Sequence, residues 1–157
     1  MITFSVSALE KNPVRKSGAL PAEFLDLAPE DSFAAAGEVT YDVTAALVSG
    51  GVLVSGELSV PLTTVCGRCL KEIGFTLSSG EIRLFFEIDD STEELETGEE
   101  LRAELLLALP MNPLCSEQCR GLCPECGCDL NESSCDCDVS SAAGAVSPWS
   151  ALDDLKL

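Results

Sequence analysis

Polar and apolar residues alternate at the start of the chain, which predicts a short β-strand there. Ile2, Phe4, Val6 and Ala8 alternate with polar neighbours, and a period of two residues is typical of a half-buried strand. The chain therefore begins in a sheet.

Further strand-like stretches occupy most of the first half of the chain. Residues 33–48 and 52–65 are joined by Ser49-Gly50-Gly51, where glycine supplies the positive φ angles of a tight hairpin turn. Residues 73–88 predict one or two more strands around Ser78-Ser79-Gly80. Together these stretches predict a mainly antiparallel sheet that is curved or partly closed.

Two segments, one before these stretches and one after them, are predicted to be connections. Residues 11–29 contain Pro13, Gly18, Pro21 and Pro29, which predict a connecting loop that rests on the core. Residues 87–100 hold eight acidic side chains in fourteen positions, which predicts a solvated linker over about residues 87–98.

A helix is predicted after this acidic stretch. Thr97 and Glu100 have the spacing of a capping box. Leucines then recur at helical spacing until a proline ends the helix; they are Leu101, Leu105 and Leu109, followed by Pro110. The stripe is expected to pack on the sheet.

The last part of the chain predicts a flexible segment and a short helix. Residues 139–147 are rich in serine, alanine and glycine. Pro148 can start a helix whose apolar face carries Trp149, Leu152 and Leu155.

The expected fold class is therefore α+β, with one central helix, a cysteine-rich module and a short C-terminal helix. We expect a β-rich domain over residues 1–110, a zinc-binding module over residues 111–138, and residues 139–157 as the flexible segment and last helix.

Composition removes several classes of enzyme. The 157 residues include nine cysteines and no histidine, so nucleophile–histidine pairs and histidine zinc sites are excluded. Any metal site must use thiolates or carboxylates. The formal charge of −18 disfavours non-specific binding to nucleic acid, which depends on lysine and arginine.

The cysteines predict metal binding. Cys66-Gly67-Arg68-Cys69 lies between two strand-like stretches and can form a knuckle that supplies half of a tetrahedral site. Seven more cysteines fall within 23 residues, and six of them are candidate ligands: Cys115, Cys119, Cys123, Cys126, Cys135 and Cys137. Eight thiols suffice for two four-cysteine zinc sites, with Cys128 spare.

Two arrangements of these thiols are compatible with the spacing. In one, Cys66 and Cys69 join Cys123 and Cys126 as a zinc ribbon, and the remaining four thiols (Cys115, Cys119, Cys135, Cys137) form a second site. In the other, the C-terminal cluster binds its own ion, and Cys66 and Cys69 stay free or are completed separately. Either way one or two structural Zn²⁺ ions are expected, because a catalytic zinc keeps an open position.

Two other cysteine chemistries fit less well. A redox Cys-x-x-Cys is expected at a helix N-terminus in an alternating strand-helix chain, and that context is missing. The spacing of Cys119, Cys123 and Cys126 matches the iron–sulfur motif of radical enzymes, but too little chain follows Cys126 for their barrel.

The chain resembles the YceD-like proteins, also called large ribosomal RNA subunit accumulation proteins. The resemblance rests on motifs in order along the chain: Cys66-Gly67-Arg68-Cys69-Leu70, Glu104-Leu105-Leu106-Leu107-Ala108-Leu109-Pro110 with Pro113 and Cys115, Cys119-Arg120-Gly121-Leu122-Cys123-Pro124-Glu125-Cys126-Gly127, Leu130-Asn131, Cys135-x-Cys137, and Pro148-Trp149 with Leu152 and Leu155. Cys128 departs from the family pattern and is excluded from the ligand set.

This resemblance implies a non-catalytic bacterial cytoplasmic factor that supports 23S rRNA accumulation, processing or ribosome assembly. The absence of a secretory signal and of a long apolar run agrees with that location. The acidity favours a basic ribosomal protein or a large-subunit assembly intermediate as partner. Two alternatives remain: direct rRNA contact through Arg68, Lys71 and Arg120, and an RNA-processing enzyme that uses the acidic residues of 87–100.

Overall fold

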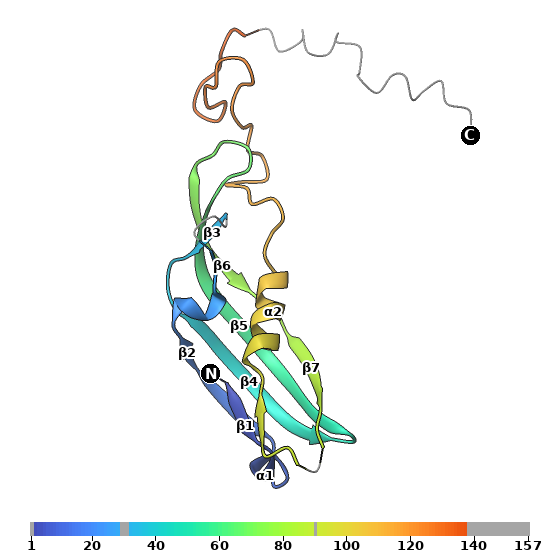
Figure 1. Ribbon diagram of the computed structural model, residues 1–157. Coiled ribbons are helices and arrows are strands. Elements are labelled where there is room, and N and C mark those ends of the chain that lie inside the picture. Colours follow the sequence, from blue (N-terminus) through green and yellow to red (C-terminus); the bar gives the residue numbers. More distant parts are fainter. Residues whose placement is uncertain (1, 29–31, 90, 138–157) are drawn as a thin grey trace, which may run out of the picture.

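A six-stranded antiparallel sheet organises the chain, of which the computed structural model describes residues 2–28, 32–89 and 91–137 (Figure 1). In chain order the elements are β1 (Thr3–Ser5), α1 (Val6–Leu9), β2 (Val14–Leu20), the 3-10 turn η1 (Ala22–Leu25), β3 (Phe33–Ala35), β4 (Val39–Val48), β5 (Gly51–Val65), β6 (Glu72–Ser78), β7 (Ile82–Glu87), β8 (Glu94–Glu96) and α2 (Gly98–Leu107).

The 15-residue strand β5 is the centre of the sheet. On one edge it pairs with β4 and β3, and on the other with β7 and β6, always antiparallel. At about 3.3 Å per residue, β5 spans about 50 Å. It therefore connects the β4–β5 hairpin at one end of the molecule with the cysteine-rich segment at the other (Figure 1).

Alternating residues of β4 and β5 form the core. Their inward side chains are at most 1% exposed: Val39, Val43, Ala45, Val52, Val54, Leu58, Val60 and Leu62. The cover over this face comes from α2 through Leu101 and Leu105, from η1 through Leu25, and from β1 through Phe4. Burial of each large side chain contributes about 1.5–3 kcal/mol to folding.

The mainly antiparallel sheet is thus confirmed, but two expected connections contain strands. Within residues 11–29, β2 pairs with β4 from Val14↔Ala45 to Leu20↔Val39. Because β2 is an edge strand with mostly exposed side chains, it has no apolar alternation that the sequence could display. Its small and polar residues therefore resembled a loop.

The acidic stretch ends in a strand, so the expected linker over residues 87–98 is corrected in this part. Leu95 lies opposite Phe4 in the β1–β8 pair and is 8% exposed. Leu95 packs into the core between the exposed Glu94 and Glu96, and backbone pairing with β1 holds the rest of the segment. No helix in the described part of the chain is long and apolar enough to span a bilayer.

Helix α2 begins after Thr97, but the expected capping box does not form. The Thr97 hydroxyl makes no cap hydrogen bond and instead donates to the carbonyl oxygen of Ile2 at 3.0 Å. Leu101 and Leu105 are buried as predicted. The predicted flexible segment and short helix within residues 139–157 lie outside the described residues.

Candidate metal centres

The first cysteine turn joins β5 to β6. The backbone N–H of Cys66 donates to the carbonyl of Lys71 at 2.8 Å, and the N–H of Leu70 donates to the carbonyl of Cys66 at 3.0 Å. Leu70 has a positive φ of 59°, which turns the chain back into β6. Cys66 and Cys69 are 0% and 5% exposed.

A second cysteine turn has the same hydrogen bonds in the irregular segment after α2. The N–H of Cys123 donates to the carbonyl of Cys128 at 2.8 Å, and the N–H of Gly127 donates to the carbonyl of Cys123 at 2.9 Å. Gly127 has a φ of 73°. The two Cys-x-x-Cys sequences therefore fold into equivalent knuckles.

Eight thiols gather into two groups of four. The first quartet consists of Cys66, Cys69, Cys115 and Cys119, and the second quartet of Cys123, Cys126, Cys135 and Cys137; within each, all Sγ atoms lie within 4.8 Å of one another. These are the eight cysteines predicted from the sequence, and Cys128 lies outside both quartets.

The sulfur spacing fits a tetrahedral metal ion. Cys66 Sγ lies 3.8 Å from Cys119 Sγ, and Cys69 Sγ lies 3.7 Å from Cys115 Sγ. With Zn–S bonds of about 2.3 Å, a tetrahedron separates its sulfurs by about 3.8 Å, whereas a disulfide brings them to about 2.05 Å. All nine cysteines are free thiols.

Neither arrangement inferred from the spacing describes this pairing in full. The knuckle cysteines do not share one site, and the cluster after α2 is divided between two. The cause is a contact between segments far apart in the sequence: Gly67 donates its N–H to the carbonyl of Pro113 at 2.8 Å. This contact brings Cys115 and Cys119 to the β5–β6 loop, which spacing alone cannot reveal.

The electrostatics of each quartet favour a bound cation. The backbone N–H groups of Cys69 and Arg68 lower the pKa of the Cys66 thiol to about 6, and those of Cys126 and Glu125 lower the pKa of Cys123 to about 6.

Other thiols in the quartets are held in the neutral form by their neighbours. The sulfurs of Cys119 and Cys69 raise the pKa of Cys115 to about 12. Four thiolates at this spacing repel one another, so a divalent cation is the group that allows all four to ionise. Four-sulfur tetrahedral sets bind zinc or iron, and both quartets offer that donor set.

Polar contacts fasten the cysteine-rich segment to the β5–β6 loop. Arg68 Nη1 donates to the carbonyl of Cys119 at 2.9 Å. Lys71 Nζ lies 3.0 Å from Asp129 Oδ2 and 2.6 Å from Glu132 Oε1. Arg68 and Lys71, two of the three residues of the predicted basic site, are therefore engaged in contacts within the protein. Among the described residues, the third, Arg120, has no ion pair or side-chain hydrogen bond.

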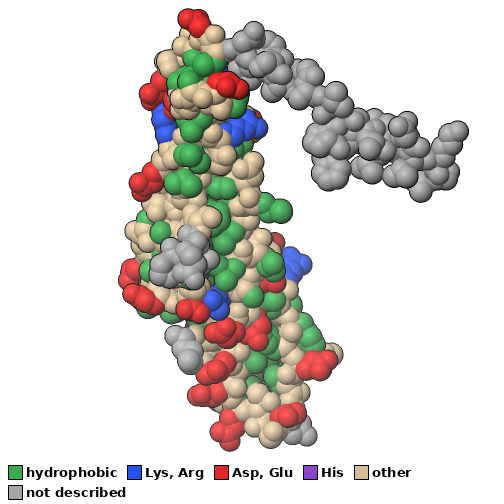
Figure 2. All heavy atoms as spheres, turned by 45° about the horizontal axis from the view of Figure 1, so that its top comes forward, with side chains coloured by type: hydrophobic (Ala, Val, Ile, Leu, Met, Phe, Trp, Pro, Cys, Tyr) green, Lys and Arg blue, Asp and Glu red, His purple; other side chains and the backbone are tan. Residues whose placement is uncertain are grey.

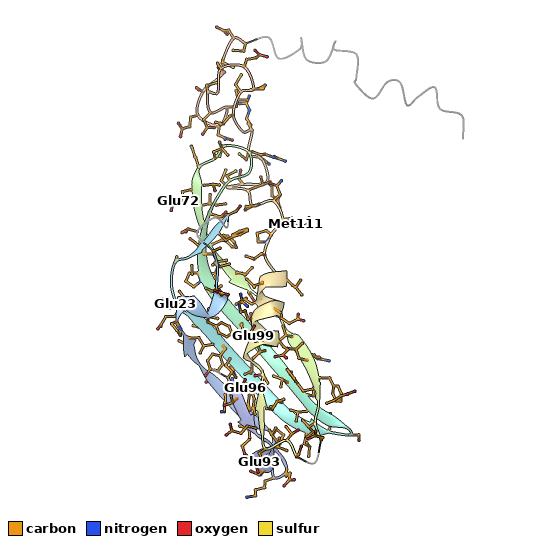
Figure 3. The ribbon with its side chains drawn as sticks, in the orientation of Figure 1. Glu23, Glu72, Glu93, Glu96, Glu99 and Met111 are labelled. Carbon is orange, nitrogen blue, oxygen red and sulfur yellow. The ribbon has the colours of Figure 1, made fainter. Side chains whose placement is uncertain are left out.

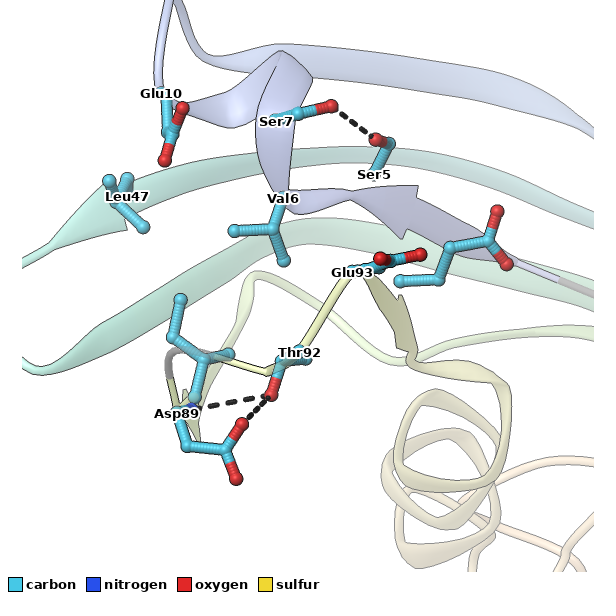
Figure 4. A pocket seen from close by; sticks show the side chains of 10 residues that line it. Ser5, Val6, Ser7, Glu10, Leu47, Asp89, Thr92 and Glu93 are labelled. Carbon is cyan, nitrogen blue, oxygen red and sulfur yellow. Dashed lines mark hydrogen bonds between the residues drawn. The ribbon is translucent and has the colours of Figure 1, made fainter.

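The opposite end of the molecule carries a cavity of about 580 Å³ with an acidic lining (Figure 4). Glu10, Asp89, Glu93 and Glu94 line it beside Val6 and Leu47. Asp89 accepts hydrogen bonds from Ser91 and Thr92 in its own loop, which lower its pKa. Within the described ranges, only the two cysteine quartets bring three or more potential ligand atoms together, so these carboxylates do not form such a group.

Acidic residues are distributed over the length of the molecule. Figure 3 shows Glu23, Glu72, Glu93, Glu96 and Glu99 at separate positions between the α1 end and the cysteine-rich end. The view in Figure 2 has many acidic side chains over the sheet and its covering elements, and few basic ones. The acidity is thus a property of the surface.

Comparisons with known proteins relate the later part of the sequence to a family. Residues 85–156 match the family described as Large ribosomal RNA subunit accumulation protein YceD. The matched part contains α2 and six of the eight quartet cysteines.

Relatives among curated proteins are uncharacterized. The chain is 34% identical over 103 residues to Uncharacterized protein Rv2926c of Mycobacterium tuberculosis, with 57% of this chain and 50% of the relative covered. It is 29% identical over 106 residues to Uncharacterized protein ML1660 of Mycobacterium leprae, with 59% of this chain and 49% of the relative covered. The chain spans about half the length of these relatives. No solved structure matches it. The predicted resemblance to the YceD family is confirmed by the family match over residues 85–156.

Proposed function

We propose that this protein is a non-catalytic cytoplasmic factor that supports accumulation of the large-subunit (23S) rRNA, through its processing or through ribosome assembly. The observation that carries the proposal is the family match over residues 85–156, since the family is named for accumulation of large ribosomal RNA. The matched residues include the second quartet and the helix that precedes the cysteines.

In this proposal each quartet holds one structural Zn²⁺. Four thiolates fill the tetrahedral positions and leave none open for a substrate, so the ion contributes stability rather than catalysis. The residues that would hold the first ion come from the β5–β6 loop and from the segment after α2. Metal binding would therefore fix the cysteine-rich end against the sheet.

The partner in this proposal is a basic ribosomal protein or a large-subunit assembly intermediate. The formal charge of −18 attracts basic surfaces and repels phosphate backbones. Each four-thiolate zinc centre adds about −2 to that charge. Direct rRNA contact is less favoured, because the charged groups of Lys71 and Arg68 are already engaged in contacts within the protein.

Affinity purification of the full chain at its native expression level tests this proposal. We expect mass spectrometry to find large-subunit proteins or assembly intermediates above an untagged control, and deletion of the gene to lower 23S rRNA relative to 16S rRNA. The same purification after ribonuclease treatment distinguishes a protein partner, which is retained, from rRNA, whose removal would release the ribosomal components.

A matched variant, Cys66→Ser with Cys69→Ser, tests the role of the metal. It removes two ligands of the first quartet and should weaken the copurification. Purification of the wild-type chain without any enriched ribosomal component, together with a normal ratio of 23S to 16S rRNA in the deletion strain, would contradict the proposal.

A further inference from the structure

Asn131 lies in the sequence between the cysteine pairs of the second quartet, yet its side chain contacts the first quartet. Its amide Nδ2 donates to Cys119 Sγ at 3.5 Å. Cys119 is 3% exposed, whereas Asn131 is exposed, so the amide meets a buried sulfur from the surface of the protein.

Two further hydrogen bonds fix the orientation of the Asn131 amide. Its Oδ1 accepts from the backbone N–H of Arg120 at 2.8 Å, and its Nδ2 donates to Asp129 Oδ1 at 2.7 Å. A rotation that exchanged the amide oxygen and nitrogen would place oxygen against the carboxylate and NH₂ against an N–H group. The nitrogen therefore faces Cys119.

Asp129 connects this amide to the β5–β6 loop. Its Oδ1 also accepts the backbone N–H of Asn131 at 2.8 Å, while its Oδ2 lies 3.0 Å from Lys71 Nζ. Lys71 is two residues from Cys69, a member of the first quartet. The network thus reaches the first quartet from both of its cysteine pairs.

The second knuckle determines where Asn131 lies. The chain leaves the first quartet at Cys119, passes through the knuckle of Cys123–Cys128, and returns where Leu130 donates its N–H to the carbonyl of Gly121 at 2.9 Å. Leu122 also donates to the carbonyl of Arg68 at 3.2 Å. Ordering the second quartet therefore orders the loop that presents Asn131.

We propose that Asn131 is a positioning residue of the first metal centre, held by Asp129 and Lys71, and that it couples metal binding at the two quartets. This inference rests on the proposed metal binding. An N–H donor to a ligand sulfur stabilises the thiolate and fixes its direction, and loss of such outer contacts typically costs about 10–100-fold in metal affinity.

The test compares Asn131→Asp with Asn12→Asp in the full chain loaded with cadmium-113. Asn131→Asp keeps the oxygen that accepts from Arg120 and loses the N–H donor, while Asn12 is exposed and adds the same charge away from the quartets. Cadmium-113 NMR gives each four-thiolate centre its own resonance, so chelator titration reports on each centre separately.

We expect Asn131→Asp to lower the affinity of the first centre about 10–100-fold and to shift its resonance. The affinity of the second centre should fall by a smaller factor, because coupling between two sites is reciprocal. The double variant Cys135→Ser with Cys137→Ser should also lower the metal affinity of the first centre. Adding Asn131→Asp to this double variant should lower that affinity little further. Lys71→Met changes a half-exposed side chain and should weaken metal binding at the first centre severalfold. It tests the same network with a second variant, in case Asn131→Asp does not fold.

Equal affinities of the first centre in Asn131→Asp, Lys71→Met and Asn12→Asp, with both centres loaded, would overturn this inference alone. A wild-type chain that binds no metal would overturn the metal proposal and this inference with it. The two failures are therefore distinguishable.

Discussion

Leu70 and Gly127 occupy the same position in the two knuckles, four residues after the first cysteine. Both donate their N–H to the carbonyl of that cysteine, and both have a positive φ, 59° for Leu70 and 73° for Gly127. Glycine adopts this conformation without steric cost, whereas leucine does not. Leu70 is also 63% exposed, so packing does little to offset the cost.

We predict that Leu70→Gly raises the free energy of unfolding by about 1 kcal/mol, because it removes the cost of the left-handed conformation. Leu70→Ala keeps the Cβ atom and should change stability by less than about 0.5 kcal/mol. Urea unfolding at fixed zinc concentration, followed by circular dichroism, measures both.

The reciprocal variant is Gly127→Ala, whose added Cβ meets no atom within 4 Å. This substitution should lower the free energy of unfolding by about 1 kcal/mol, because alanine is strained in the left-handed conformation. Equal stabilities of Leu70→Gly and Leu70→Ala would show that the turn carries no such cost.

The sequence predicts Thr97 as a helix cap, but its hydroxyl contacts the N-terminal segment of the chain instead. The side chain is fully buried and donates to the carbonyl of Ile2. A local motif in the sequence gives no information on a partner brought in by β1. The existence of the helix was predictable from its leucines, while the role of this hydroxyl was not.

We predict that Thr97→Val lowers the free energy of unfolding by about 1 kcal/mol, since the shape is kept and one buried hydrogen bond is lost. Thr40→Val is the control, because the Thr40 hydroxyl bonds to Ser59 on the exposed face of the sheet. The control should stay within about 0.5 kcal/mol of wild type in the same thermal or urea unfolding measurement. Identical losses in both variants would argue against a special role of the Ile2 contact.

At the level of elements, the sequence predicts strands well where they are half-buried. Strands β4 and β5 alternate clearly and lie in predicted stretches, although the stretch over residues 33–48 is divided into β3 and β4. The one or two strands predicted over residues 73–88 are two, β6 and β7. The edge strand β2 and the short strand β8 were not predicted, because their stability comes from pairing and from one or two anchoring residues. Tertiary contacts outweigh local composition in both cases.

The anchoring role of Leu95 can be measured. We predict that Leu95→Ala lowers the free energy of unfolding by about 2–3 kcal/mol, the usual cost of truncating a buried leucine. Its neighbour Glu94 is exposed, so Glu94→Ala should change stability by less than about 0.5 kcal/mol. A Leu95→Ala protein as stable as Glu94→Ala would mean that the acidic segment is a solvated linker after all.

The candidate site shows the same division between what spacing reveals and what it does not. Cysteine count and spacing predicted the eight residues that gather, because closely spaced cysteine pairs are typical of metal sites. Their partition into quartets depends on the path of residues 110–119 along the β5–β6 loop, and therefore on contacts such as Gly67 with Pro113.

For the molecule as a whole, the net charge is the property that bears on the proposed partner. The surface is acidic along its length, as the view in Figure 2 illustrates. Association of oppositely charged surfaces is accelerated at low salt and weakened by screening.

We therefore predict that ribosomal components bound to the purified chain at low salt are released by a high-salt wash, because screening removes the attraction between the acidic surface and a basic partner. Quantitative mass spectrometry of the two fractions measures the effect, with a neutral tagged protein as control. Retention that is independent of salt would require an apolar interface instead of a charged one.

We propose that the two quartets of thiols each hold one metal ion, and elemental analysis of the metal-replete full chain measures this. We expect about two zinc ions per chain for wild type and for Cys128→Ser, and about one for Cys66→Ser with Cys69→Ser or for Cys135→Ser with Cys137→Ser. A single ion in wild type that is lost in both double variants, or no bound metal at all, would contradict it.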